Sequence, residues 1–169
     1  MTRRAVVQKW ILYSLCALAL VLVQSLLLVR VQVWGVHPFL LPAIAVIPVT
    51  LERDEGALLF SVFFGLACDL LTPGAGRPCF YALAVLVSGG LAWLLSGRVV
   101  AAGLVCSLAA AASALVVCGV LHLAVLAGSQ SVDVTAAAVL AGKEAALSLP
   151  LTVLVHYPFR RICLLTQRD

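Results

Sequence analysis

The feature that most constrains this chain is a series of long apolar runs separated by short polar turns. The first run extends from Trp10 to Val29 without a charged side chain. About 20 apolar residues in a helix match the ~30 Å hydrocarbon core of a bilayer, where the backbone must satisfy its own hydrogen bonds. The chain is 64% hydrophobic and only 11% charged, and soluble domains carry about 25% charged residues. Residues 1–169 are therefore predicted to form a single integral membrane domain.

The runs predict an all-α fold, a polytopic membrane bundle of six transmembrane helices. The expected spans are about 10–29, 34–51, 57–72, 79–97, 99–127 and 134–157. The apolar part of the second run is short and contains Pro38, Pro42 and Pro48. Its helix either begins earlier, near Val31, or is kinked and shielded by neighbouring helices. The first run is longer than the apolar part of a signal peptide, so it is interpreted as a retained helix.

Basic residues predict the orientation of the bundle, because Lys and Arg are retained on the cytoplasmic side of a membrane protein. Six spans place both termini on one side. The side of the termini carries Arg3, Arg4, Lys9, Arg53, Arg98, Arg160, Arg161 and Arg168. The opposite side carries only Arg30 and Arg77, while Lys143 falls within the sixth run. Both termini are therefore expected in the cytoplasm.

Asp69 is an acid near the outer end of the third run. A carboxylate there carries part of the membrane penalty and meets the negative end of the helix dipole, so helix stability does not explain it. Three explanations stay open. Asp69 could pair with Arg77 or accept N–H bonds from the loop 73–76, it could contact another helix or protein, or it could relay protons or take part in catalysis.

Glu144 is the other embedded acid and follows Lys143 in the sixth run. If that helix begins at Val134, the two residues lie at mid-depth and Glu144 could have a buried partner. If the helix begins later, the pair lies at the outer interface.

Other reactive residue types give no pattern typical of catalysis or metal binding. His37, His122 and His156 form no HxxxH or HExxH arrangement, and each is expected to bond to a neighbouring helix. The six cysteines form no CxxC pair and are expected to be small apolar residues. There is no plausible nucleophile with a His partner and no Gly-rich phosphate loop. The sequence therefore predicts a protein that is not an enzyme and needs no cofactor or metal.

Small residues recur at four-residue spacing in the fifth run, at Gly103, Ser107 and Ala111 and again at Ala110 and Ala114. Such faces allow close helix packing in lipid. They serve either the bundle itself or a partner helix.

The order of these features resembles the rod shape-determining protein MreD family. The carriers of the resemblance are a basic N-terminus, a Pro-bearing second run, and the segment GLACD with Gly65, Leu66 and Asp69, followed by a Gly-containing loop. The loop glycine corresponds to Gly74 or Gly76, although the sequence PGAGRP departs from the commoner loop of the family. Pro150 and a basic tail at Arg160 and Arg161 also fit.

The resemblance implies a non-enzymatic scaffold subunit of the cell-elongation complex in the bacterial cytoplasmic (inner) membrane. Its partners would be MreC and, through it, MreB, RodA and a class B penicillin-binding transpeptidase. The structural or interaction candidates are Gly65, Leu66, Asp69, Gly76, Arg77 and Glu144, and Gly65 would let another backbone approach closely.

An alternative is a six-helix substrate-binding subunit of an energy-coupling-factor transporter, to which MreD-like proteins are similar. That protein would bind a vitamin or similar solute in an outward-facing cavity, with Asp69, His122 and Trp34 as candidate ligands. The sequence has small residues for a coupling subunit but lacks a convergent set of polar ligands.

Overall fold

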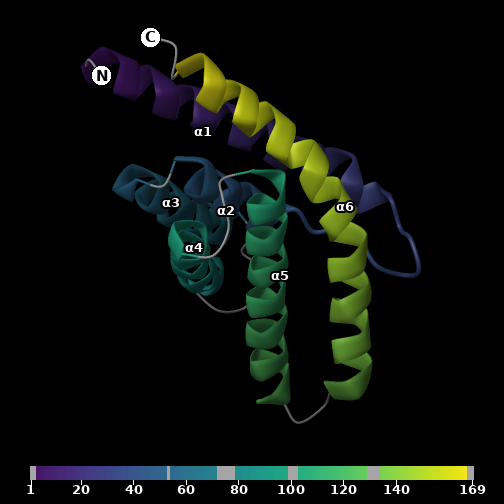
Figure 1. Ribbon diagram of the computed structural model, residues 1–169. Helices are drawn as coiled ribbons and strands as arrows, with labels where there is room; N and C mark the ends of the chain where they lie inside the picture. The colour runs from purple at the N-terminus through teal and green to yellow at the C-terminus, as the bar shows by residue number, and fades with distance from the viewer. Residues whose placement is uncertain (1–2, 53, 72–78, 99–102, 129–133, 167–169) are drawn as a thin grey trace.

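The computed structural model describes residues 3–52, 54–71, 79–98, 103–128 and 134–166. Within these ranges the chain forms six α-helices and one short 3-10 turn, and no strand (Figure 1). The helices are α1 (Arg3–Leu26), α2 (Leu41–Glu52), α3 (Glu55–Leu71), α4 (Phe80–Arg98), α5 (Leu104–Ala127) and α6 (Val134–Thr166), with the 3-10 turn η1 at Leu28–Arg30. The all-α prediction is confirmed.

Among the described residues, three helices are long and apolar enough to cross a membrane. The segments are Val6–Arg30, Leu104–Val125 and Thr135–Thr166. Two shorter apolar helices, Leu41–Glu52 and Phe80–Leu94, fall below that length. The lengths and composition of three helices therefore support a membrane protein. The other spans of the predicted six-span topology stay a prediction.

The short helix α2 forms the centre of the bundle. Every residue from Pro42 to Thr50 is buried, which requires neighbours on all sides of the helix. Those neighbours are α1, α3, α4, α5 and α6. Pro42 is tolerated because it lies in the first turn, and the Ser61 hydroxyl of α3 donates to the Ala45 carbonyl (2.9 Å) one turn before the internal Pro48.

The predicted start of the second span, at residue 34 or earlier, is wrong. Trp34 and Gly35 have positive φ angles of 56° and 79°, and Val33 and Val36 exchange two backbone bonds of 3.1 Å in a tight turn. Helix α2 begins only at Leu41, so its 12 residues extend about 18 Å. The prolines and this turn keep residues 31–40 out of the helix.

Two polar side chains hold the segment that leads into α2. Gln24 of α1 donates to the Pro38 carbonyl (2.7 Å) and accepts from the Leu40 N–H (3.2 Å). The Ser148 hydroxyl of α6 accepts the Phe39 N–H at 2.8 Å. Three backbone groups just before α2 are therefore satisfied by side chains of other helices.

Helix α6 extends beyond its predicted end at residue 157. It continues to Thr166 because its last turns bury one face, formed by Val155, His156, Phe159 and Cys163. This face packs on α1, where the rings of Tyr13 and Phe159 stack with centroids 5.7 Å apart. The tail predicted after the sixth span is thus helical, and Arg160 and Arg161 project from its other face.

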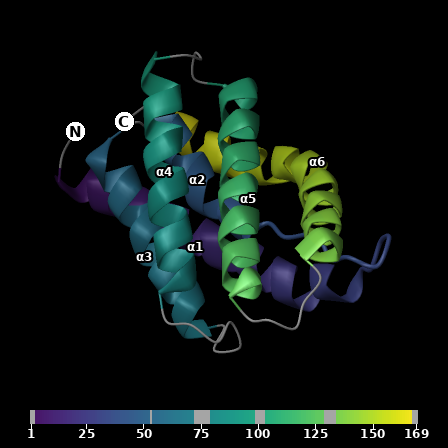
Figure 2. The same cartoon turned by 90° about the horizontal axis from the view of Figure 1, so that it is seen from below.

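The arrangement of the helices brings the start of α1 close to the end of α6 (Figure 1). The first turns of α1 and the last turns of α6 lie side by side at one end of the molecule, and α6 changes direction along its length (Figure 1). Pro150 lies inside α6 and cannot bond to the carbonyl four residues earlier, which allows such a bend. Seen from below, α4 and α5 run beside each other, with α3 next to α4 (Figure 2).

Candidate functional site: the Asp69 joint and the adjoining cavity

The Asp69 carboxylate binds the N-terminus of the following helix. Its two oxygens accept the backbone N–H groups of Tyr81 (2.8 Å) and Ala82 (2.9 Å) in the first turn of α4. These N–H groups have no acceptor within their own helix, and the positive end of the α4 dipole faces the carboxylate. A cap of this kind contributes about 0.5–2 kcal/mol, which offsets the unfavourable position of an acid at the end of α3.

Of the three explanations for Asp69, contact with another helix is the one that these bonds show. The expected partners in the loop 73–76 and Arg77 lie outside the described residues, as does Gly76. In the described part of the chain, Asp69 connects the end of α3 to the start of α4.

Gly65 lies one turn before Asp69, where the first turn of α4 comes close to the backbone of α3. A Cβ atom at Gly65 would lie 3.0 Å from the Ala82 Cα and 3.0 Å from the Tyr81 carbonyl oxygen. Only a glycine fits there without displacing α4, so the expected close approach of another backbone at Gly65 is confirmed. Leu66 is 42% exposed and projects from the outer surface of α3. We call the contact of Gly65 and Asp69 with the first turn of α4 the Asp69 joint.

Sequence reasoning missed a buried ion pair at the other end of the molecule. The Lys9 ammonium of α1 lies 2.6 Å from a Glu52 oxygen at the end of α2, and the Tyr13 hydroxyl donates to the other oxygen at 2.8 Å. Lys9 is only 5% exposed, and Asp54 lies farther off, at 3.8 Å. A signal was present, because Lys9 and Arg53, which follows Glu52 in the sequence, were predicted to lie on the same side.

The small-residue face of α5 packs inside the bundle. Ser107, Ala110, Ala111 and Ala114 are all buried, and Ser107 is hydrogen-bonded to Thr50 of α2 (3.0 Å). The described part of this face therefore serves the bundle itself rather than a partner helix. Ser107 also contacts His156 Nδ1 at 3.0 Å, which confirms the expected bond of that histidine to a neighbouring helix.

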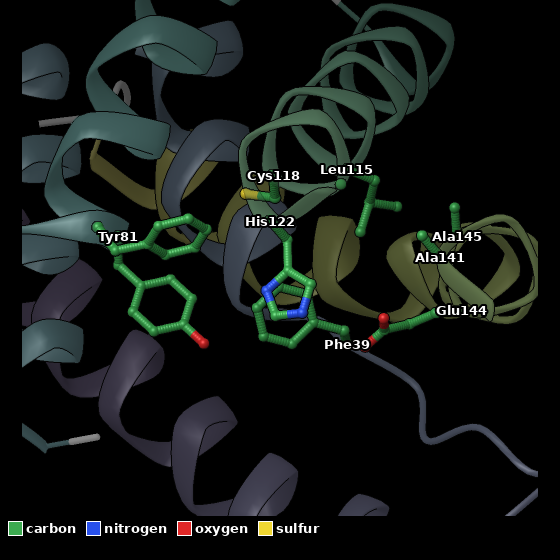
Figure 3. A pocket seen from close by; sticks show the side chains of 10 residues that line it. Phe39, Tyr81, Leu115, Cys118, His122, Ala141, Glu144 and Ala145 are labelled. Carbon is green, nitrogen blue, oxygen red and sulfur yellow. The ribbon is translucent and has the colours of Figure 1, made fainter. Parts of the chain in front are cut away.

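A cavity of about 150 Å³ adjoins the Asp69 joint. Aromatic rings contribute much of its wall, and Glu144 contributes a carboxylate. Figure 3 shows the Tyr81 hydroxyl, the His122 ring and the Glu144 carboxylate directed toward a common space, with Phe39 nearby. Cys118 of α5 and Phe80 of α4 complete this part of the wall. His122 is exposed, so the cavity is open on its side.

The contacts that hold the helices also fix the cavity. Tyr81 and Phe80 belong to the first turn of α4, which the Asp69 joint anchors. Phe39 is anchored through its N–H to Ser148, whose hydroxyl also donates to the Glu144 carbonyl at 2.6 Å. The motif at Asp69 therefore has a second consequence, because it positions an aromatic wall of the cavity.

The structure separates the residues that the transporter alternative would combine. His122 lines the cavity, but the Asp69 oxygens are bonded to the backbone of α4, and Trp34 is 70% exposed on a turn outside it. Glu144 lines the cavity, whereas Lys143 is exposed. Helix α6 begins at Val134, which is the alternative in which Glu144 was expected to lie inside the bundle rather than at the outer interface. Among the described residues, no group of three or more His, Cys, Asp or Glu side chains could hold a metal ion.

Comparison of the chain with protein-family models, curated proteins and solved structures finds no match in any of the three.

Proposed function

We propose that this chain is a scaffold subunit of the bacterial cell-elongation machinery, without enzymatic activity of its own. On this proposal it crosses the cytoplasmic membrane six times, has both termini in the cytoplasm and requires no cofactor. It binds the membrane-anchored protein MreC. Through MreC it helps to couple MreB filaments to RodA and the class B transpeptidase, which maintains cell shape.

The observation that carries the proposal is the Asp69 joint. The short motif that resembles the MreD family is used to fix one helix against the next, since both carboxylate oxygens accept backbone N–H groups of α4. A motif used in this way suits a protein that acts by presenting a fixed surface to partners. It is less suited to a catalytic acid or a ligand-binding acid, which needs a free oxygen.

The experiment that tests the proposal is affinity purification of the tagged chain from its native membrane in mild detergent, followed by mass spectrometry. Enrichment of MreC and the peptidoglycan synthases is the expected result. Recovery of the intact chain without any of these proteins would contradict the scaffold proposal.

The second candidate is a substrate-binding subunit of an energy-coupling-factor transporter, and the cavity of about 150 Å³ beside the Asp69 joint favours it for a solute smaller than a vitamin. This function requires a solute site within the bundle, and the cavity combines aromatic rings with Glu144 and His122. The same purification separates the two candidates, because the transporter subunit would bring down an ATPase pair and a coupling subunit.

A further inference from the structure

Glu144 is an acid without an assigned partner in the described part of the chain. Neither oxygen of its carboxylate takes part in a described hydrogen bond or ion pair, whereas Glu52 and Asp69 are both bonded through two oxygens. Glu144 is half-buried and lies in a helix that can cross a membrane. A carboxylate in such a place is costly unless a positive group or several donors lie beside it.

Among the described residues, the potential cations that interact with Glu144 are histidines. His37 and His122 are close enough to interact with it electrostatically. No described Lys or Arg side chain forms an ion pair with Glu144: Lys143 is exposed, and Lys9 is bound to Glu52.

The aromatic side chains in the wall of the cavity indicate which kind of ligand could bind there. Phe39 and Tyr81 lie with ring centroids 6.1 Å apart, and Phe80 lies 5.3 Å from Tyr81. Several aromatic rings and one carboxylate that line the same cavity can recognise an organic ammonium group, by cation–π attraction and by a charge-assisted contact.

The cavity volume argues against a large solute, and the described side chains argue against a metal ion. A cavity of ~150 Å³ holds a molecule about the size of benzene, so a headgroup of a few heavy atoms fits and a vitamin-sized solute does not. A metal ion is disfavoured because the described residues offer no cluster of three metal-ligating side chains.

We infer that the cavity between α4, α5 and α6 binds a small organic ammonium group, held by the Glu144 carboxylate and the rings of Phe39, Phe80 and Tyr81. The group belongs either to a free amine or to the headgroup of an aminophospholipid. This site is additional to the scaffold function and does not depend on it.

The test uses the purified full-length chain in mild detergent, with two probes of the same shape. Choline carries a quaternary ammonium group, and 3,3-dimethylbutan-1-ol is its neutral carbon isostere. Saturation-transfer NMR titrations are expected to show choline binding at least about tenfold tighter than the alcohol, because the rings and the carboxylate act on the charge. Equal affinity for the two probes would show an apolar cavity only and would overturn the inference.

Two variants locate the binding in this cavity. Glu144→Gln keeps the shape of the side chain but removes its charge, and is expected to weaken choline binding by about tenfold or more. Phe39→Leu removes a ring face and is expected to weaken choline several-fold while leaving the alcohol nearly unchanged. The matched control is Glu55→Gln, at an exposed position in the first turn of α3, and should bind choline as the parent does.

A second arm distinguishes a lipid from a free amine. Native mass spectrometry of the chain loaded with phosphatidylethanolamine or phosphatidylglycerol would detect a retained lipid. Retention of phosphatidylethanolamine in the parent but not in Glu144→Gln assigns the ammonium group to a lipid, and choline binding without such retention assigns it to a free amine. If neither probe binds in a Glu144-dependent way, the inference is wrong, whatever partners the chain recovers from membranes.

Discussion

Glu52 and Glu144 both lie in helices of the bundle, but their surroundings are opposite. Glu52 is bonded to the Lys9 ammonium and the Tyr13 hydroxyl, and its side chain is 8% exposed. Glu144 faces a cavity and has no such bond among the described residues. The comparison teaches that an embedded acid can stabilise the fold or remain available to a ligand, depending on the groups that packing brings to it. Substitutions at the two sites should therefore change the free energy of unfolding by different amounts and in opposite directions.

The largest expected effect is at the buried ion pair. Lys9→Met leaves the Glu52 charge without its cation and should lower the free energy of unfolding by about 3–5 kcal/mol. The measurement is unfolding of the purified chain in mixed detergent micelles. The double variant Lys9→Met with Glu52→Leu should recover most of this loss, because no uncompensated charge remains. A double variant as unstable as the single one would break the comparison.

A smaller loss of stability is expected where Gly65 of α3 contacts the first turn of α4. Gly65→Ala places a methyl group 3.0 Å from backbone atoms of α4 and should cost about 1–3 kcal/mol of unfolding free energy. Gly90→Ala in the middle of α4 is the matched control, since no atom lies within 4 Å of its added Cβ. The control should stabilise the helix by up to about 1 kcal/mol. Equal effects at both glycines would contradict the close packing at Gly65.

Removal of the cap should cost somewhat less. Asp69→Ala deprives the Tyr81 and Ala82 N–H groups of their acceptor and should lower the free energy of unfolding by about 0.5–2 kcal/mol. Asp69→Asn keeps one acceptor oxygen and should cost less. Immunoblots of membrane fractions are expected to show reduced accumulation of Asp69→Ala. Selective loss of partner recovery at normal abundance would instead make Asp69 a residue of an intermolecular contact.

The smallest effect on the free energy of unfolding is expected at Glu144. Glu144→Gln breaks no described hydrogen bond and removes a half-buried charge without an ion-pair partner, so the free energy of unfolding without ligand should rise slightly, by up to about 0.5 kcal/mol. The same unfolding assay in ligand-free detergent measures it. A loss as large as that of Lys9→Met would mean that Glu144 is bound to the protein as firmly as Glu52 is.

The sequence by itself determined the helical class and the approximate limits of the helices with simple boundaries. The expected segments 57–72 and 79–97 correspond closely to α3 and α4, because charged or Pro-Gly stretches flank them. Apolar runs of this length must satisfy their own backbone, and a helix does so with local bonds alone. That part of the fold needs no knowledge of which helices touch.

Only the tertiary structure decided the start of α2, the extension of α6 and the partners of the acids. Helix α2 begins late because side chains of α1 and α6 satisfy the irregular segment before it, and α6 continues because α1 covers Phe159. Asp69 finds its donors 12 and 13 residues away, and Glu52 finds its cation 43 residues away. Such pairings depend on which helix ends meet in space. In a chain this apolar, many helix packings bury similar surfaces, and the sequence pattern alone does not choose among them.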